Sequence, residues 1–191
     1  EVRIAEPAEF GPALDRLGAE GARVLADPAS APAYVFNRLE DAGARILKGD
    51  DPCTLPKAVK TAVEIAGTRA AHVRDGAALT RFLAWLAAAA PTGGVSESAA
   101  ATKLAALRAE GEHFRDLSFD TISGAGPNGA IVHYHVTPDS DRVLSPGMLY
   151  LVDSGGQYLD GTTDVTRTIF IGGDGAAPSD EERDRFTRVL K

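Results

Sequence analysis

The chain has 191 residues, of which 44% are hydrophobic and 25% charged, a composition typical of folded globular proteins. Its net charge of −7 is uneven, because residues 91–191 hold fifteen acidic and nine basic side chains. That balance disfavours a nucleic-acid-binding surface, which needs a basic face. No apolar run reaches the roughly 18 residues that a membrane-spanning helix requires. The single cysteine, Cys53, cannot form a disulfide within this chain, so we expect a cytoplasmic protein without nucleic-acid or membrane partners.

Residues 1–54 alternate helical and extended segments. The predicted elements are a helix over 9–17, a strand over 22–26, a helix capped by Ser30 that runs to Asp41, and a strand over 45–48. This αβαβ order indicates the C-terminal part of an α/β domain. Residues 55–60 are predicted to form an extended lead-in to a second domain, 55–191.

Two helices are predicted near the start of that second domain. Thr61 and Glu64 have the spacing of a capping box, so one helix is expected over 62–90. Ser96 can cap another helix over 97–109. The pattern after them predicts four strands of a curved antiparallel sheet, over 119–123, 130–134, 148–153 and 165–171. We therefore expect an α+β fold in which the helices cover this sheet.

Two aspartates flank a turn-rich segment between the last two predicted strands. Asp153 ends one strand and Asp164, eleven positions later, begins the next. If these strands pair antiparallel, the carboxylates can face each other at roughly 5 Å between Cβ atoms. Carboxylates that close repel each other unless a proton or a cation lies between them. Their oxygens suit Mg²⁺ or Mn²⁺, or Zn²⁺ and Co²⁺ if an imidazole joins. An alternative interpretation of the residues alone is a turn cap and a surface ion pair.

Three histidines, His72, His133 and His135, are candidate ligands or catalytic groups. His133 and His135 are two positions apart in a predicted strand, so both would project from the same face. Taken alone, a strand histidine is more often half-buried than functional. We interpret His135 as a surface residue and Tyr134 as packing. His72, on the long helix, has no second ligand type at helical spacing and is interpreted as structural.

The sequence DSGGQYLDGTTDVTRT, residues 153–168, resembles the metal motif of the pita-bread metallopeptidases, in the form most similar to Xaa-Pro aminopeptidases (aminopeptidase P). The sequence FDTISGAGPNGAIVHY, residues 119–134, resembles the segment that precedes this motif in the same family. The resemblance implies that Asp153 binds one metal ion and Asp164 bridges two. It also implies that His133 lines the substrate pocket and hydrogen-bonds the reacting amide. Two divalent ions are implied, with Mn²⁺ expected and Zn²⁺ or Co²⁺ as alternatives.

The same resemblance implies the first half of a pita-bread (creatinase/aminopeptidase-like) fold, preceded by the tail of an α/β domain. Residues 1–54 would be the C-terminal part of an upstream creatinase/prolidase-like domain. Residues 55–191 would be the truncated N-terminal half of the catalytic domain. The family's other metal ligands, one histidine and two glutamates, have no match in this sequence. We therefore expect an internal fragment that lacks a complete site.

For the parent protein, the resemblance implies a hydrolase of the metalloprotease class. It would remove an N-terminal residue that precedes proline by means of a hydroxide that two metal ions activate. Its partners would be peptides with proline at the second position, and the parent is expected to be a homodimer. The isolated fragment is expected to be inactive. The alternatives are a prolidase acting on dipeptides, a methionine aminopeptidase, which the preceding α/β segment fits poorly, and a non-enzymatic pita-bread module that binds peptides or proteins.

Overall fold

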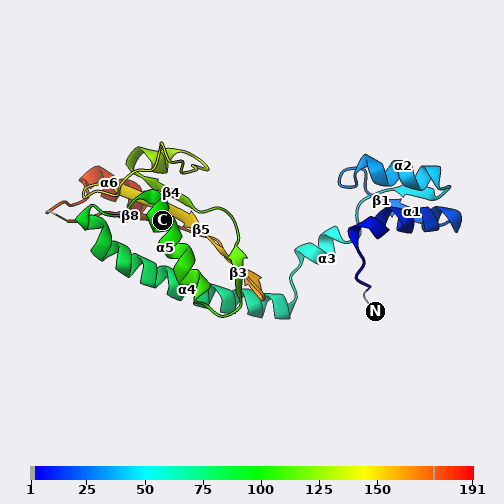
Figure 1. Ribbon diagram of the computed structural model, residues 1–191, viewed down its shortest axis with the longest axis horizontal. Helices are drawn as coiled ribbons and strands as arrows, with labels where there is room; N and C mark the ends of the chain where they lie inside the picture. The colour runs from blue at the N-terminus through cyan, green and yellow to red at the C-terminus, as the bar shows by residue number, and fades with distance from the viewer. Residues whose placement is uncertain (1–2, 174) are drawn as a thin grey trace. The chain divides into compact units, whose positions relative to one another are not determined.

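The computed structural model describes residues 3–173 and 175–191. The chain divides into two compact units, Glu1–Lys60 and Thr61–Lys191. Each unit combines helices with strands (Figure 1), so the fold class is α+β. The assignment of residues 1–54 to the end of an upstream domain, and of residues 55–191 to the N-terminal half of a catalytic domain, stays a prediction.

The first unit is built on a pair of parallel strands. Its elements are η1 (Pro7–Glu9), α1 (Phe10–Ala19), β1 (Arg23–Ala26), α2 (Ala33–Asp41), β2 (Arg45–Lys48) and α3 (Thr54–Ala58). Strand β1 pairs with β2 in parallel, and α2 forms the crossover between them. Leu14 of α1 and Leu39 of α2 are buried and contribute to the small core of this unit. The predicted αβαβ order is confirmed.

Two local predictions in this unit are wrong. Ser30 does not cap α2, because the backbone N–H of Ser30 donates to the Asp27 carbonyl in a turn and Pro32 is the N-cap residue. Residues 55–60 are not extended, because α3 occupies most of that stretch. Pro56 lies in the first turn of α3, where its missing N–H leaves no intrahelical acceptor unsatisfied.

Three helices of the second unit begin with side-chain caps. They are α4 (Ala62–Ala89), α5 (Glu97–Ala109) and α6 (Asp180–Leu190). The Thr61 hydroxyl accepts from the Glu64 N–H at 3.3 Å, and the Glu64 carboxylate accepts from the Thr61 N–H at 2.7 Å. Ser96 accepts from the Ala99 N–H in the same way. The predicted capping box and the predicted helices 62–90 and 97–109 are confirmed, with α4 followed by the short helix η2 (Ala90–Thr92).

The strands of the second unit form two antiparallel sheets. One has the order β4 (Ile122–Ala125), β5 (Leu149–Ser154) and β8 (Val165–Phe170), and the other has the order β3 (Phe114–Leu117), β6 (Gly156–Tyr158) and β7 (Gly161–Thr162). The predicted strands 148–153 and 165–171 are confirmed. The strand predicted over 119–123 begins later, at Ile122, and the sheet of β3, β6 and β7 was not predicted.

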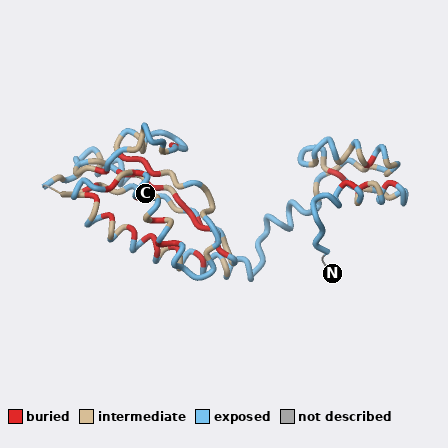
Figure 2. Tube along the Cα trace, in the orientation of Figure 1, coloured by how far each residue is buried: buried red, intermediate tan, exposed pale blue. Residues whose placement is uncertain are grey.

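The core of the second unit lies between its first two helices and one face of the β4-β5-β8 sheet. Its fully buried side chains include Phe82, Leu86, Leu104, Leu144 and Tyr150. Figure 2 shows buried stretches along the helices and the central strands of this unit. Burial alternates along β5, so one face of the strand packs in the core and the other face is turned away from it. No helix within residues 3–173 and 175–191 combines the length and apolar character needed to cross a membrane.

The strand predicted over 130–134 is wrong. Helix η3 (Gly126–Ala130) occupies the start of this segment, and tight turns follow it. The Tyr134 N–H donates to the Ile131 carbonyl at 3.2 Å instead of to a neighbouring strand. His133 adopts a left-handed backbone conformation with φ 54°, which a strand cannot contain. The expectation that His133 and His135 share one face of a strand is therefore also wrong.

Candidate metal-binding and catalytic site

A hollow of about 400 Å³ lies at one end of the β4-β5-β8 sheet. It is lined by Phe119, Asp120, Ile122, His133, Tyr134, His135, Asp153 and Asp164. The structure therefore brings together all three residues that the sequence indicated, namely His133, Asp153 and Asp164. The hollow also contains Asp120 and His135, for which no functional role was predicted. Ile122 pairs with Asp153 across the sheet, and Asp120 lies two residues before Ile122. Because side chains alternate along a strand, this spacing could have predicted that Asp120 lies on the same side as Asp153.

The strand register fixes how the two aspartates approach each other. Asp153 of β5 pairs with Thr166 of β8, and Asp164 lies two residues before Thr166. Counting the ladder back from this pair makes Asp164 the diagonal neighbour of Asp153, a position with a typical spacing of roughly 7–8 Å. Contrary to the expectation, the residue directly opposite Asp153 is Thr166 and not Asp164. Both carboxylates still line the same hollow.

The Asp153 carboxylate is incompletely hydrogen-bonded. Its Oδ1 atom is buried and has no hydrogen-bond partner among the described residues. A buried carboxylate oxygen without a donor or a counterion is unfavourable. A divalent cation between Asp153 and Asp164 would satisfy it, so these residues fit a metal ion. Within the described ranges, no group of three or more His, Cys, Asp or Glu side chains is placed to hold one. The aspartate pair is thus a partial ligand set.

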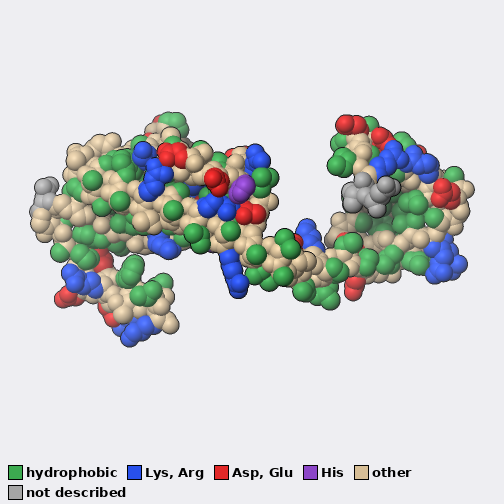
Figure 3. All heavy atoms as spheres, turned by 90° about the horizontal axis from the view of Figure 1, so that it is seen from below, with side chains coloured by type: hydrophobic (Ala, Val, Ile, Leu, Met, Phe, Trp, Pro, Cys, Tyr) green, Lys and Arg blue, Asp and Glu red, His purple; other side chains and the backbone are tan. Residues whose placement is uncertain are grey.

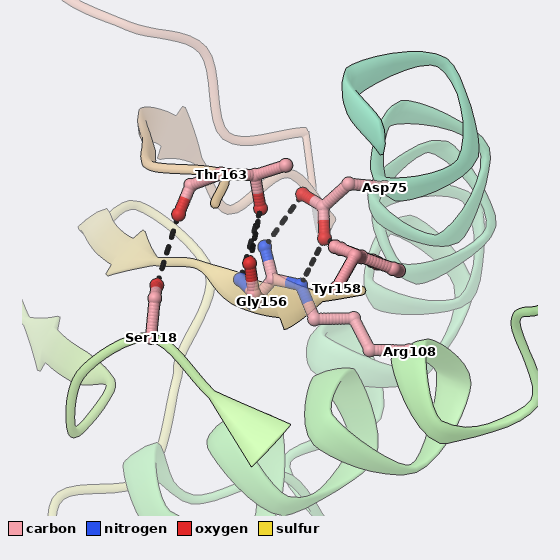
Figure 4. A network of polar contacts seen from close by, with 6 residues as sticks. All are labelled: Asp75, Arg108, Ser118, Gly156, Tyr158 and Thr163. Atoms are coloured by element: carbon pink, nitrogen blue, oxygen red, sulfur yellow. Dashed lines mark hydrogen bonds and ion pairs between the residues drawn. The ribbon is translucent and has the colours of Figure 1, made fainter. Parts of the chain in front are cut away.

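Hydrogen bonds at the base of the hairpin connect the chain next to Asp153 with the chain next to Asp164 (Figure 4). Ser118 donates twice, from its N–H to the Gly155 carbonyl at 3.1 Å and from its Oγ to the Thr163 carbonyl at 2.9 Å. The Gly156 N–H donates to Thr163 Oγ1 at 2.9 Å, and the Thr163 N–H donates to the Gly156 carbonyl at 2.9 Å. Thr163 directly precedes Asp164 and is 1% exposed. These bonds hold the strand ends that carry the two aspartates.

Close packing requires glycine at the two adjacent positions Gly155 and Gly156 of this hairpin. A Cβ on Gly156 would lie 2.8 Å from a ring carbon of Tyr158. A Cβ on Gly155 would overlap the Thr163 carbonyl oxygen and the Ser118 Oγ. The Gly155-Gly156 pair therefore permits the hydrogen bonds that fix the hairpin.

We expect Gly155→Ala to destabilise the protein by about 1–3 kcal/mol, because the new methyl group must displace backbone rather than a flexible side chain. Urea unfolding measures the change. Gly172→Ala is the matched control, since a Cβ there would meet no atom of the described residues within 4 Å. Equal unfolding midpoints for the two variants would contradict this account of the hairpin.

Two aspartates, one with an unpartnered oxygen, and a histidine line one hollow of this α+β unit, and carboxylates and imidazole are the side chains that bind divalent metal ions in proteins. The sequence profile of metallopeptidase family M24 matches residues 66–191. The chain belongs to this family.

Relatives within the family are named as aminopeptidases. The chain is 54% identical over 136 residues to a probable Xaa-Pro aminopeptidase P of Laccaria bicolor, covering 71% of this chain and 21% of that protein. It is 38% identical over 190 positions to aminopeptidase P1 of Arabidopsis thaliana, covering 88% and 28%. The chain thus spans about a fifth to just over a quarter of the length of these curated relatives.

Solved structures show the same fold. The X-prolyl aminopeptidase of Caenorhabditis elegans, described as a cytosolic enzyme with a di-nuclear active site, superimposes with a TM-score of 0.76 at 31% identity, covering 94% of this chain and 29% of that one. The X-Pro aminopeptidase of Thermotoga maritima gives a TM-score of 0.76 at 23% identity, covering 100% and 51%. At that identity, the second likeness supports the fold alone.

Proposed function

We propose that the protein containing this chain is a metal-dependent aminopeptidase that removes an N-terminal residue preceding proline. One observation carries the proposal: Asp153, whose buried Oδ1 has no hydrogen-bond partner among the described residues, lines one hollow together with Asp164 and His133 in a chain of the M24 family. In this proposal, residues 55–191 form the N-terminal half of a pita-bread catalytic domain. Residues 1–54 form the end of an upstream creatinase/prolidase-like α/β domain.

The aspartates would hold two divalent ions, with Mn²⁺ expected and Zn²⁺ or Co²⁺ as alternatives. When bound, such ions lower the pKa of water so that a hydroxide nucleophile is available near neutral pH. Asp153 would bind one ion, and Asp164 would bridge both. The His133 imidazole, in the same hollow, could donate a hydrogen bond to the scissile carbonyl oxygen or to the leaving proline nitrogen.

The expected partners are peptides with proline at the second position, and the complete enzyme is expected to be a cytoplasmic homodimer. Two features argue against nucleic acid as a partner. The net charge is −7, and basic and acidic side chains are interspersed on the face shown in Figure 3, without a single-sign patch there. A nucleic-acid surface would instead gather Lys and Arg.

Two measurements test this proposal. A full-length enzyme with Mn²⁺ should cleave an Xaa-Pro-Pro tripeptide after its first residue, and a chelator should abolish the cleavage. The 191-residue chain by itself should bind Mn²⁺ weakly and show no measurable turnover, since two carboxylates are too few ligands for a stable two-metal site.

Three other results of these measurements would each contradict a part of this proposal. Hydrolysis confined to Xaa-Pro dipeptides would indicate a prolidase. Peptide binding without hydrolysis would indicate a non-enzymatic module. Chelator-sensitive turnover by the 191-residue chain would show that its ligand set is complete without further residues.

A further inference from the structure

Glu97, the first residue of α5, is fully buried at 0% exposure. Its Oε1 atom accepts from the Ala125 N–H at 2.6 Å and from Asn128 Nδ2 at 2.9 Å. Its Oε2 atom accepts from the Tyr134 hydroxyl at 3.0 Å and from the Arg142 N–H at 3.1 Å. These donors come from the end of β4, from η3, from the segment that carries His133, and from the segment before β5. One carboxylate thus connects four pieces of chain.

The backbone of Glu97 is fixed as firmly as its side chain. Its N–H donates to the Arg142 carbonyl at 3.0 Å, and its carbonyl accepts from Ser123 Oγ at 2.7 Å. Glu97 therefore cannot shift without disturbing α5, β4 and the segment before β5. A group held on both sides in this way is a rigid reference point for the loop that it binds.

The bond between Glu97 and the Tyr134 hydroxyl also fixes residues 131–135, which we call the histidine loop. All three residues 133–135 line the hollow, but Tyr134 is only 6% exposed whereas His133 and His135 are exposed. Asn128 Nδ2 also donates to the Tyr134 hydroxyl, at 2.8 Å. These bonds fix the phenol, and with it the backbone that carries His133 and His135. The left-handed backbone of His133 is unfavourable for a residue other than glycine and needs such an anchor.

The Tyr134 phenol is protonated and lies within hydrogen-bond distance of the Glu97 carboxylate at 3.0 Å, the Ser140 hydroxyl at 2.9 Å and the Ser140 carbonyl at 3.2 Å. Burial raises the pKa of Tyr134, the Ser140 hydroxyl partly opposes this, and the hydrogen bond to Glu97 adds to the rise. The phenol is therefore a donor at neutral pH. Glutamate suits its position because all four groups that approach its oxygens donate. A glutamine amide would present its own N–H₂ to at least one of those donors.

We propose that Glu97, acting through the Tyr134 hydroxyl, is a positioning residue that holds the His133 side chain at the Asp153–Asp164 hollow. The proposal rests on the proposed function in one respect, since it takes this hollow as the reaction site. Neither Glu97 nor Tyr134 needs to touch substrate. Their effect is on where His133 lies.

The test uses the 191-residue chain and the variant Tyr134→Phe, which removes one hydroxyl and little volume. The matched control is Tyr150→Phe, because Tyr150 is a buried tyrosine whose hydroxyl lies 2.7 Å from Ser123 Oγ, so its loss leaves the bond from Ser123 Oγ to the Glu97 carbonyl and all bonds of the Glu97 carboxylate in place. Substoichiometric Mn²⁺ is added, and NMR line broadening of the imidazole protons is compared between His133 and His72. His72 lies on α4 and does not line the hollow.

In the unchanged chain and in Tyr150→Phe, His133 should broaden selectively. In Tyr134→Phe, the selective broadening should be lost while the melting temperature falls by only a few degrees. Retained broadening in Tyr134→Phe, or equal loss in both variants, would overturn the positioning role. Glu97→Gln should reproduce the loss, since it removes an acceptor and adds a donor.

A metal-free measurement separates this inference from the proposed function. If Mn²⁺ broadens no histidine in the unchanged chain, the metal site is wrong, and amide hydrogen exchange at residues 131–135 then decides the positioning role. Faster exchange there in Tyr134→Phe, with unchanged exchange in Tyr150→Phe, supports it. Equal exchange in both variants refutes it.

Discussion

In a full-length enzyme, replacing Asp164 by asparagine is expected to lower kcat/KM further than replacing His133 by alanine. Asp164 would bridge both ions, so its loss should empty or distort the two-metal site and remove the source of the nucleophile. His133 would contribute hydrogen bonding in the transition state, a contribution of roughly 10²–10³-fold in rate. The Asp164→Asn variant should therefore lose more of its kcat/KM than the roughly 10²–10³-fold expected for His133→Ala.

Metal content must be measured beside kcat/KM with Mn²⁺ saturating. Asp164→Asn should retain less metal than the unchanged enzyme, whereas His133→Ala should retain the full amount. His72→Ala serves as the control, because the His72 ring bonds the Thr68 carbonyl of its own helix and lies outside the hollow. If Asp164→Asn keeps two ions and a near-normal rate, the metal assignment of this hairpin is wrong.

The parts of the fold that sequence predicted well are those set by neighbouring residues. Thr61 and Glu64 satisfy each other's backbone groups three residues apart, so the start of α4 depends on nothing distant. The strand containing Asp153 is a short apolar run between turn signals, and it formed where predicted. These local features, together with the motif, pointed to His133, Asp153 and Asp164, and the three residues line one hollow.

The parts that sequence missed depend on distant partners. Residues 130–134 have the composition of a strand, but Glu97, more than thirty positions earlier, binds Tyr134 and draws the segment into turns. The diagonal placement of Asp153 and Asp164 depends on the register between β5 and β8, which the hairpin bonds from Ser118 help to set. A residue remote in sequence leaves no trace in local periodicity.

A second tertiary contact, between α4 and α5, carries the largest expected effect on stability. Asp75 of α4 and Arg108 of α5 form a buried two-fold hydrogen-bonded ion pair, with Arg108 Nε donating to Asp75 Oδ1 at 2.7 Å and Nη2 donating to Oδ2 at 3.0 Å (Figure 4). The Tyr158 hydroxyl donates to Asp75 Oδ1 at 2.9 Å. Since Tyr158 belongs to β6, this group connects both helices to the hairpin between the two aspartates.

Replacing Asp75 by alanine should therefore lower the free energy of unfolding by about 3–5 kcal/mol, because it leaves the Arg108 guanidinium buried without its counterion. Glu110→Ala is the matched control, since Arg81 and Glu110 pair at 2.7 Å between α4 and the end of α5 with both side chains more than half exposed. An exposed pair of this kind contributes about 1 kcal/mol or less. Denaturant unfolding followed by circular dichroism measures both variants.

The double variant Asp75→Leu with Arg108→Met separates the loss of an interaction from the presence of an unpaired charge. If the single variant is destabilised mainly by the buried guanidinium, removing both charges should restore much of the lost stability, because an apolar pair of similar size can replace a buried ion pair. Tyr158 would then lack its acceptor, so the hairpin and its weak Mn²⁺ affinity should recover less than the helices do. A double variant as unstable as Asp75→Ala, or an Asp75→Ala variant no worse than Glu110→Ala, would show that this network does not hold the two helices and the hairpin together.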